Sequence, residues 1–140
     1  MKEMTFKVLK ASNIDIRAKI DGSGPLIVLV HGYPESWYSW RNQIPILVEA
    51  GYTTAAIDVR GYGGSSKPYE IESYGMRELT RDVIGVIDAL GFKTAILIGH
   101  DWGAPIVWNT AVLNEKRISA IVGLSVPFVP RGKISTIDLW

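Results

Sequence analysis

The segment Gly99-His100-Asp101-Trp102-Gly103 decides the fold of this 140-residue chain. It follows an apolar, β-branched run at residues 94–98, and it precedes a second apolar segment at 104–108 that can begin a helix. The pattern glycine, any residue, nucleophile, any residue, glycine is typical of a tight turn between a strand and a helix. Such a turn exposes the central side chain above the sheet. Neighbouring backbone crowds such a turn, so glycine is needed at both ends.

The central residue of this turn is aspartate, where serine is the usual nucleophile. A carboxylate in this position can attack an alkyl carbon and form an ester. Asp101 is therefore predicted to be the catalytic nucleophile. Gly99, His100 and Gly103 are assigned supporting roles, and His100 is interpreted as an orienting residue rather than a general base.

A second segment, His31-Gly32-Tyr33-Pro34, directly follows the apolar run Leu26–Val30. A backbone amide in this loop can point at an oxygen of an intermediate formed at Asp101, with the amide of Trp102 as its partner. Two such donors make an oxyanion hole. Taken alone, the segment is more typical of an ordinary turn leaving a sheet, and only its pairing with the 99–103 motif favours function.

Hydrophobic patterning predicts strands that alternate with helices, and hence a parallel, doubly wound sheet opened by an antiparallel hairpin. Ligands bind such sheets at the carboxyl ends of the strands, where both motifs lie. The expected strands are 4–11, 14–20, 26–30, 53–58, 94–98 and 118–126, and the expected helices are 40–50, 75–90 and 104–113.

Two further segments are given structural roles. The helix at 75–90 is amphipathic, and its outward face is predicted to carry Arg77, Glu78, Arg81 and Asp82. In the glycine-rich segment 58–66, Asp58 and Arg60 are expected to brace loops near the site rather than to perform chemistry.

Composition excludes several classes of function. The 15 basic and 14 acidic residues give a net charge of +1, so nothing favours binding to nucleic acid. No cysteine is present and no histidine–carboxylate cluster has ligand spacing, so no metal is expected. Residues 61–64 lack the dinucleotide-binding fingerprint, so no organic cofactor is expected either. No apolar run is long enough for a signal or a membrane span, and a cytoplasmic location is the default expectation.

Four stretches resemble the epoxide hydrolase branch of the α/β-hydrolase superfamily: HGYPESWYSW (31–40), DVRGYGGSSKP (58–68), GHDWGAP (99–105) and LSVPF (124–128). The resemblance implies that Asp101 attacks a carbon of a small-molecule epoxide and that an ester forms. Water then cleaves the ester to give a vicinal diol. It also implies an oxyanion hole made by the amides of Tyr33 and Trp102, a cis Tyr33–Pro34 bond, and strands in the spatial order 1-2-4-3-5-6-7-8.

The sequence departs from that pattern after Asp101. The family places an acid and then a histidine behind the nucleophile, but no histidine follows Asp101, and Asp138 is the only carboxylate after Glu115. Residues 1–140 are therefore expected to form the N-terminal portion of an α/β-hydrolase core, truncated after about six strands, with the helical lid and the C-terminal acid and histidine absent. Alone, the chain is expected to be inactive or to react with its substrate once, slowly.

Strand 118–126 would then be a bare edge, and an unpaired apolar edge favours association. We expect self-association or contact with a missing C-terminal portion through this strand. Two other functions stay open. His100 to Gly103 also resembles haloalkane dehalogenases, and residues 61–68 resemble fluoroacetate dehalogenases, which would make the substrate an alkyl halide. The missing histidine instead favours a non-catalytic half-domain that binds a partner.

Overall fold

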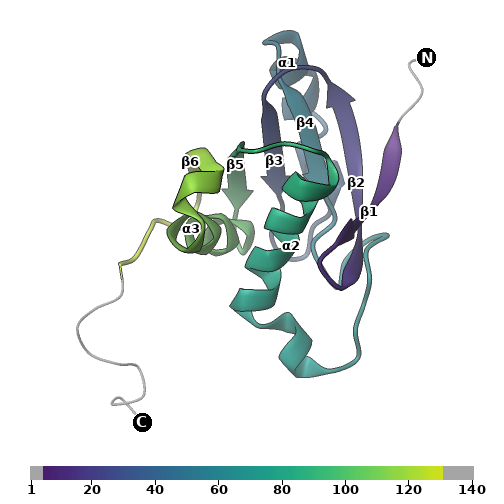
Figure 1. The fold of residues 1–140 in the computed structure, drawn as a ribbon, viewed down its shortest axis with the longest axis vertical. Coiled ribbons are helices and arrows are strands. Elements are labelled where there is room, and N and C mark those ends of the chain that lie inside the picture. The colour runs from purple at the N-terminus through teal and green to yellow at the C-terminus, as the bar shows by residue number, and fades with distance from the viewer. Residues whose placement is uncertain (1–4, 131–140) are drawn as a thin grey trace.

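The computed structural model describes residues 5–130, which form one six-stranded sheet with helices on both faces (Figure 1). The strands are β1 (Phe6–Ala11), β2 (Ile14–Gly22), β3 (Leu26–Val30), β4 (Thr53–Ile57), β5 (Ala95–His100) and β6 (Ile118–Leu124). The α-helices are α1 (Gln43–Glu49), α2 (Met76–Ala89) and α3 (Gly103–Leu113). Three short 3₁₀ helices are η1 (Trp37–Trp40), η2 (Ile71–Tyr74) and η3 (Glu115–Arg117).

The strands lie in the order β1-β2-β4-β3-β5-β6, which confirms the predicted spatial order of the first six strands. The strands of the β1–β2 hairpin are antiparallel to each other and to their neighbours, whereas β4, β3, β5 and β6 run parallel. Val30 is paired with Gly99 in the β3–β5 register. This pairing places the loops after β3 and β5 side by side at the carboxyl edge of the sheet.

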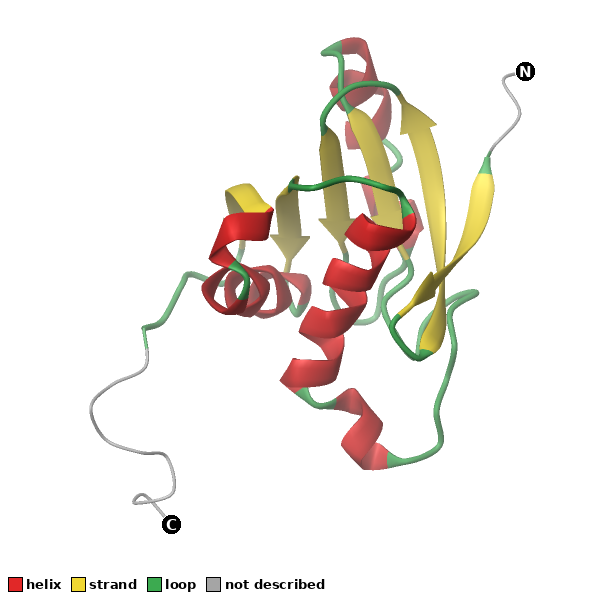
Figure 2. Cartoon of the chain, viewed as in Figure 1, coloured by secondary structure: helices red, strands yellow, loops and turns green. Residues whose placement is uncertain are grey.

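The middle strand, β3, supplies side chains to both cores of the protein. Leu26, Val28 and Val30 pack under α2 and α3, whereas Ile27 and Leu29 pack on the opposite face with residues of η1 and α1. Figure 2 shows helices on the two sides of the strands. All five residues of β3 are buried, as expected for a strand without a polar face.

Helix α2 confirms the predicted apolar face but corrects the prediction for Asp82. Val83 and Ile87 are buried, yet Asp82 is also only 2 % exposed. The guanidinium of Arg60 donates two hydrogen bonds to this carboxylate, of 2.8 Å from Nε and 2.7 Å from Nη2. A carboxylate can be buried when a bidentate partner of opposite charge compensates for the lost water.

Asp58 has the bracing role that the sequence predicts. Its carboxylate is fully buried. It accepts hydrogen bonds from Nε of Arg17 at 2.7 Å, from the N–H of Gly64 at 2.9 Å and from the N–H of Trp37 at 3.0 Å. One side chain thereby ties the glycine-rich loop and η1 to the N-terminal hairpin.

Most element boundaries differ from the expectation by one or two residues, and three differences have a structural consequence or a clear cause. The helix expected at 40–50 begins only at Gln43, after the separate 3₁₀ helix η1, and Pro45 lies in its first turn, where a missing N–H leaves no helical hydrogen bond unmade. β5 continues to His100. β6 ends at Leu124 rather than at residue 126, because Ser125 has a φ of 72° and leaves the extended conformation.

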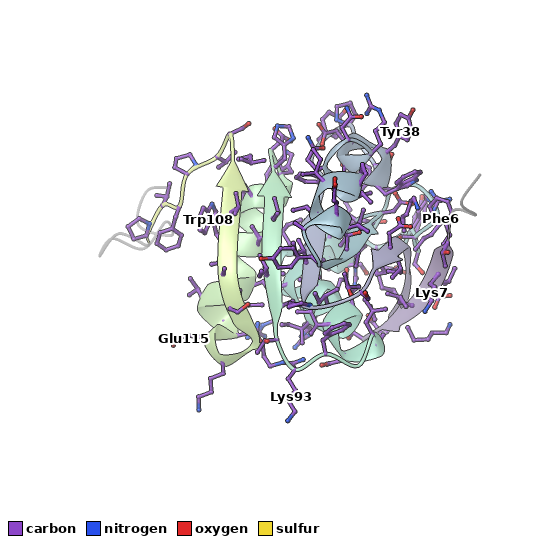
Figure 3. All side chains as sticks on the ribbon, turned by 90° about the horizontal axis from the view of Figure 1, so that it is seen from above. Phe6, Lys7, Tyr38, Lys93, Trp108 and Glu115 are labelled. Carbon is purple, nitrogen blue, oxygen red and sulfur yellow. The ribbon has the colours of Figure 1, made fainter. Side chains whose placement is uncertain are left out.

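The two edges of the sheet differ in charge. Figure 3 shows Lys7 beside β1 at one edge and Trp108 beside β6 at the other. β1 carries two exposed lysines, Lys7 and Lys10, which discourage pairing with another strand. β6 (ISAIVGL) has no charged residue and no proline, and it pairs on one side only within the part of the chain that the structure describes. Val122 and Leu124 are 43 % and 42 % exposed on this strand.

We therefore expect the purified 140-residue chain to associate through β6 as its concentration rises. Val122→Lys should shift the sedimentation-velocity distribution toward monomer, because a charge on an edge strand opposes pairing. Val8→Lys is the matched control on β1, where Val8 is 61 % exposed and lysines are already present, and it should leave the distribution unchanged. A parent chain that stays monomeric at high concentration would contradict the expectation.

Candidate active site

Asp101 occupies the turn between β5 and α3 with a φ of 53°, a strained value for a residue that has a Cβ atom. The backbone around it leaves no room for other side chains. A Cβ on Gly99 would collide with the carbonyl of Gly103, and a Cβ on Gly103 would collide with the carbonyl of Val30. The N–H of Asp101 donates to the carbonyl of Leu124 at 3.2 Å, which ties the turn to the end of β6. The predicted turn is thus present, with its central side chain raised above the sheet.

The loop after β3 brings a backbone donor to this carboxylate. The N–H of Tyr33 donates to Oδ1 of Asp101 at 2.9 Å. Gly32 lies directly under Asp101, and a Cβ there would collide with the side chain of Asp101. The Tyr33–Pro34 peptide bond is cis, as the resemblance implies. The two motifs, which are 68 residues apart at this contact, therefore meet at one hydrogen bond.

The two N–H groups predicted for this site favour a negative charge on Asp101. Hydrogen bonds from the N–H groups of Tyr33 and then Trp102 lower the pKa of Asp101 below its usual value, and a smaller desolvation effect opposes them. The carboxylate is therefore ionised at neutral pH without a neighbouring base. The Tyr33 donor engages Oδ1 and not Oδ2.

His31 is a buried structural residue, 1 % exposed. Its Nε2 accepts a hydrogen bond from the N–H of Val59 at 3.0 Å, so the proton resides on Nδ1, which donates to the carbonyl of Gly32 at 2.8 Å. Burial lowers the pKa of His31 and keeps it neutral. The ring links the loop after β3 to the loop after β4, and both of its nitrogens are occupied.

Glu35 is a residue of the site that the sequence patterns do not predict. Its Oε2 accepts the N–H of Gly32 at 2.9 Å, and its Oε1 lies 3.3 Å from Nδ1 of His100. The side chain therefore touches both motifs, one residue away from each partner of the Tyr33–Asp101 bond. A glutamate three residues after a turn glycine is a weak signal, and its contact with His100, 65 residues away, has no counterpart in local sequence.

The structure brings the predicted site residues together at the carboxyl edge of β3 and β5. His31, Gly32, Gly99 and Gly103 are buried in the support, while the side chains of Tyr33 and Trp102 are 65 % and 62 % exposed around Asp101. Pro34 is exposed and His100 is partly buried. Asp138, the carboxylate considered for the acid, lies outside the described residues.

Neither a metal site nor a membrane-spanning segment is found among residues 5–130. No group of three or more histidine and carboxylate side chains is placed to hold a metal ion in this part of the chain. Its longest α-helix, α2, has 14 residues and carries several charges, and none of the helices described could traverse a lipid bilayer.

Comparison with known proteins agrees with this geometry. Residues 25–139 match the sequence family described as the alpha/beta hydrolase fold. The chain belongs to the α/β-hydrolase family. This match confirms the predicted fold class, an α/β-hydrolase-type mixed sheet with an N-terminal antiparallel hairpin. The relatives described next confirm the resemblance to epoxide hydrolases.

This α/β-hydrolase chain is 55 % identical over 114 residues to epoxide hydrolase B of Mycobacterium tuberculosis, a match covering 81 % of the chain and 32 % of that protein. It is 50 % identical over 132 residues to epoxide hydrolase A of the same organism, covering 93 % and 41 %. The crystal structure of epoxide hydrolase A from Mycobacterium thermoresistibile superimposes with a TM-score of 0.92 at 46 % identity, covering 98 % of this chain and 44 % of that one. The chain thus spans 32–44 % of the length of these relatives.

Substitution of Gly103 tests the crowding in the turn. Gly103→Ala should lower the free energy of unfolding by about 3 kcal/mol, because the new methyl group meets backbone atoms of β3 that cannot move aside. Gly91→Ala is the control: it has a φ of 78° but nothing within 4 Å of its Cβ, so only a conformational penalty of about 1 kcal/mol is expected. Equal losses in urea unfolding would argue against crowding.

The lowered pKa of Asp101 predicts how its protonation affects stability. Because the pKa is lower in the folded than in the unfolded chain, ionised Asp101 stabilises the fold above about pH 4, and this contribution is lost as the pH falls through the folded pKa. A ¹³C NMR titration should place the carboxyl group of Asp101 below its unfolded value of about 3.9. Between about pH 5 and pH 2, the free energy of unfolding of Asp101→Asn should fall less than that of the parent. An ordinary or raised pKa for Asp101 would refute the assignment of the two N–H donors.

Proposed function

We propose that Asp101 opens an epoxide by forming an ester through Oδ2. The observation that carries this proposal is the hydrogen bond from the Tyr33 N–H to Oδ1, which orients the carboxylate and does not occupy Oδ2. Oδ2 attacks an epoxide carbon, a new C–O bond forms, and the C–O bond of the strained ring breaks. The electron pair stays on the epoxide oxygen, which then takes a proton from water to become a hydroxyl group.

Hydrolysis of the ester completes the proposed reaction. Water attacks the ester carbonyl, the alkyl oxygen leaves as the second hydroxyl of a vicinal diol, and the carboxylate is restored. The charge that develops on Oδ1 would be held by the N–H groups of Tyr33 and Trp102, which are then the oxyanion hole. This step needs a base that deprotonates water, and no histidine follows Asp101 in the 140 residues.

The two histidines of the chain are unsuited to that role. Both nitrogens of His31 are hydrogen-bonded within the protein. Nδ1 of His100 faces Glu35 rather than the ester carbon. We infer that these residues alone carry the reaction to the alkyl-enzyme ester, and that repeated turnover depends on a base and a proton donor from further polypeptide.

An alkyl halide is the second candidate substrate, and the exposed indole of Trp102 beside Asp101 is the observation that favours it. The same attack by Oδ2 would expel halide instead of opening a ring. The relatives named above are called epoxide hydrolases, and this supports an epoxide as the first choice. A non-catalytic role is disfavoured by a strained, ionised carboxylate on an exposed turn, because strain of this kind persists mainly at functional sites.

Incubation of the purified chain with styrene oxide, followed by intact-mass measurement and peptide mapping, tests the proposal. One adduct on Asp101 is expected, with no diol produced beyond one equivalent. Asp101→Asn should give none, and Asp88→Asn, which removes a carboxylate that is 58 % exposed, should react like the parent. Modification spread over several carboxylates would overturn the proposal, whereas chloride release from 1-chlorobutane without reaction of the epoxide would select the alkyl halide.

A further inference from the structure

Glu35 closes a ring of hydrogen bonds around the turn that presents the Tyr33 N–H. The N–H of Glu35 donates to the carbonyl of Gly32 at 3.2 Å, and the N–H of Gly32 donates back to Oε2 of Glu35 at 2.9 Å. The same carboxylate reaches His100, the neighbour of Asp101 in the second motif. The loops after β3 and β5 are therefore joined twice, once through Tyr33 and Asp101 and once through Glu35.

We propose that Glu35 is a positioning residue that holds the Tyr33 N–H in place after Asp101 has become an ester. This inference rests on the proposed function of Asp101. In the free protein, a charged carboxylate accepts the Tyr33 N–H, and such charge-assisted bonds are about twice as strong as neutral ones. Alkylation removes the charge, and the carbonyl oxygen that remains is a weaker acceptor.

The oxyanion of the second step therefore forms only after the first tether has weakened. The tether through Glu35 does not depend on the charge of Asp101, so it can keep the donor aligned between the two steps. Donors of this kind act through geometry fixed in advance, which makes a small displacement costly.

The charges around Glu35 suit this role. The ionisable groups close to it are His100 on the β5 turn and His31 at the end of β3, and the N–H of Gly32 points at its carboxylate. Desolvation is the largest single effect and opposes ionisation. The N–H of Gly32 and the contact with His100 outweigh it, so the pKa of Glu35 lies below its usual value. Glu35 is thus an anion at neutral pH, whatever the state of Asp101.

Amide hydrogen exchange tests the proposal without any catalysis. Asp101→Asn supplies a neutral carbonyl of the same shape as the ester. In that background, Glu35→Ala should accelerate exchange of the Tyr33 amide by about tenfold or more, whereas Glu35→Gln, whose amide oxygen can still accept the Gly32 N–H, should change it little. With Asp101 intact, Glu35→Ala should have a much smaller effect on Tyr33.

Two features make the exchange measurement decisive. Amides of β3 report whether each variant is folded, and Glu49→Ala, an exposed glutamate on α1, is the matched control. Equal exchange of the Tyr33 amide in Asp101→Asn with and without Glu35→Ala would overturn the proposal. So would an acceleration by Glu35→Ala that is just as large when Asp101 is charged.

Cleavage of the ester by hydroxylamine gives a second, chemical readout. Hydroxylamine attacks the ester carbonyl, the diol leaves, and a hydroxamate remains on residue 101, with the charge developing on the same Oδ1. Glu35→Ala should slow this step by about tenfold while changing ester formation less than twofold, since outright loss of an oxyanion donor costs about 10²–10³-fold. Equal slowing of both steps would indicate a merely structural role. If no ester forms in the parent, the proposed function fails and the exchange result still decides the role of Glu35.

Discussion

One hydrogen bond, from the Tyr33 N–H to Oδ1 of Asp101, is the constraint on which the site depends. It requires β3 and β5 to be parallel neighbours in a fixed register, so that Val30 lies opposite Gly99 and the two following loops meet. It also requires Gly32, Gly99 and Gly103 to lack side chains, because each of them faces backbone or the carboxylate at close range. Most of the packing under these loops, in the two cores on either side of β3, serves to keep that register.

The fold and the meeting of the two loops could be predicted because each leaves a local signal. The run LIVLV indicates a strand buried on both faces, the spacing of residues 99–103 indicates a strained turn, and parallel strands bring the two loops to one edge. Asp82 and Glu35 could not be placed in this way. The burial of Asp82 is decided by Arg60, 22 residues away, and the contact of Glu35 with His100 crosses between strands, so neither follows from periodicity.

The two steps of the proposed reaction, ester formation and ester hydrolysis, differ in the groups that they need. Because two backbone donors keep the Asp101 carboxyl group ionised, it is a nucleophile without help from a base, and residues 31–34 and 99–103 supply the attacking group for the proposed ester formation. Water is a poor nucleophile and must lose a proton as it attacks, so ester hydrolysis depends on a further group. The α/β-hydrolase core described here therefore supplies the nucleophile for the proposed first step and the N–H groups proposed to act in the second.

The bond from the Asp101 N–H to the carbonyl of Leu124 joins the nucleophile to the last residue of the uncharged strand at the open margin of the sheet. A polypeptide strand that pairs with β6 would restrict the motion of Leu124 and, through the hydrogen bond between them, the backbone of Asp101. Linkage is reciprocal: if docking at that margin alters the reactivity of the carboxylate through binding equilibria, then a covalent adduct must alter the docking affinity by the same factor. Docking at β6 and modification of Asp101 would therefore influence each other through the hydrogen bond between Asp101 and Leu124.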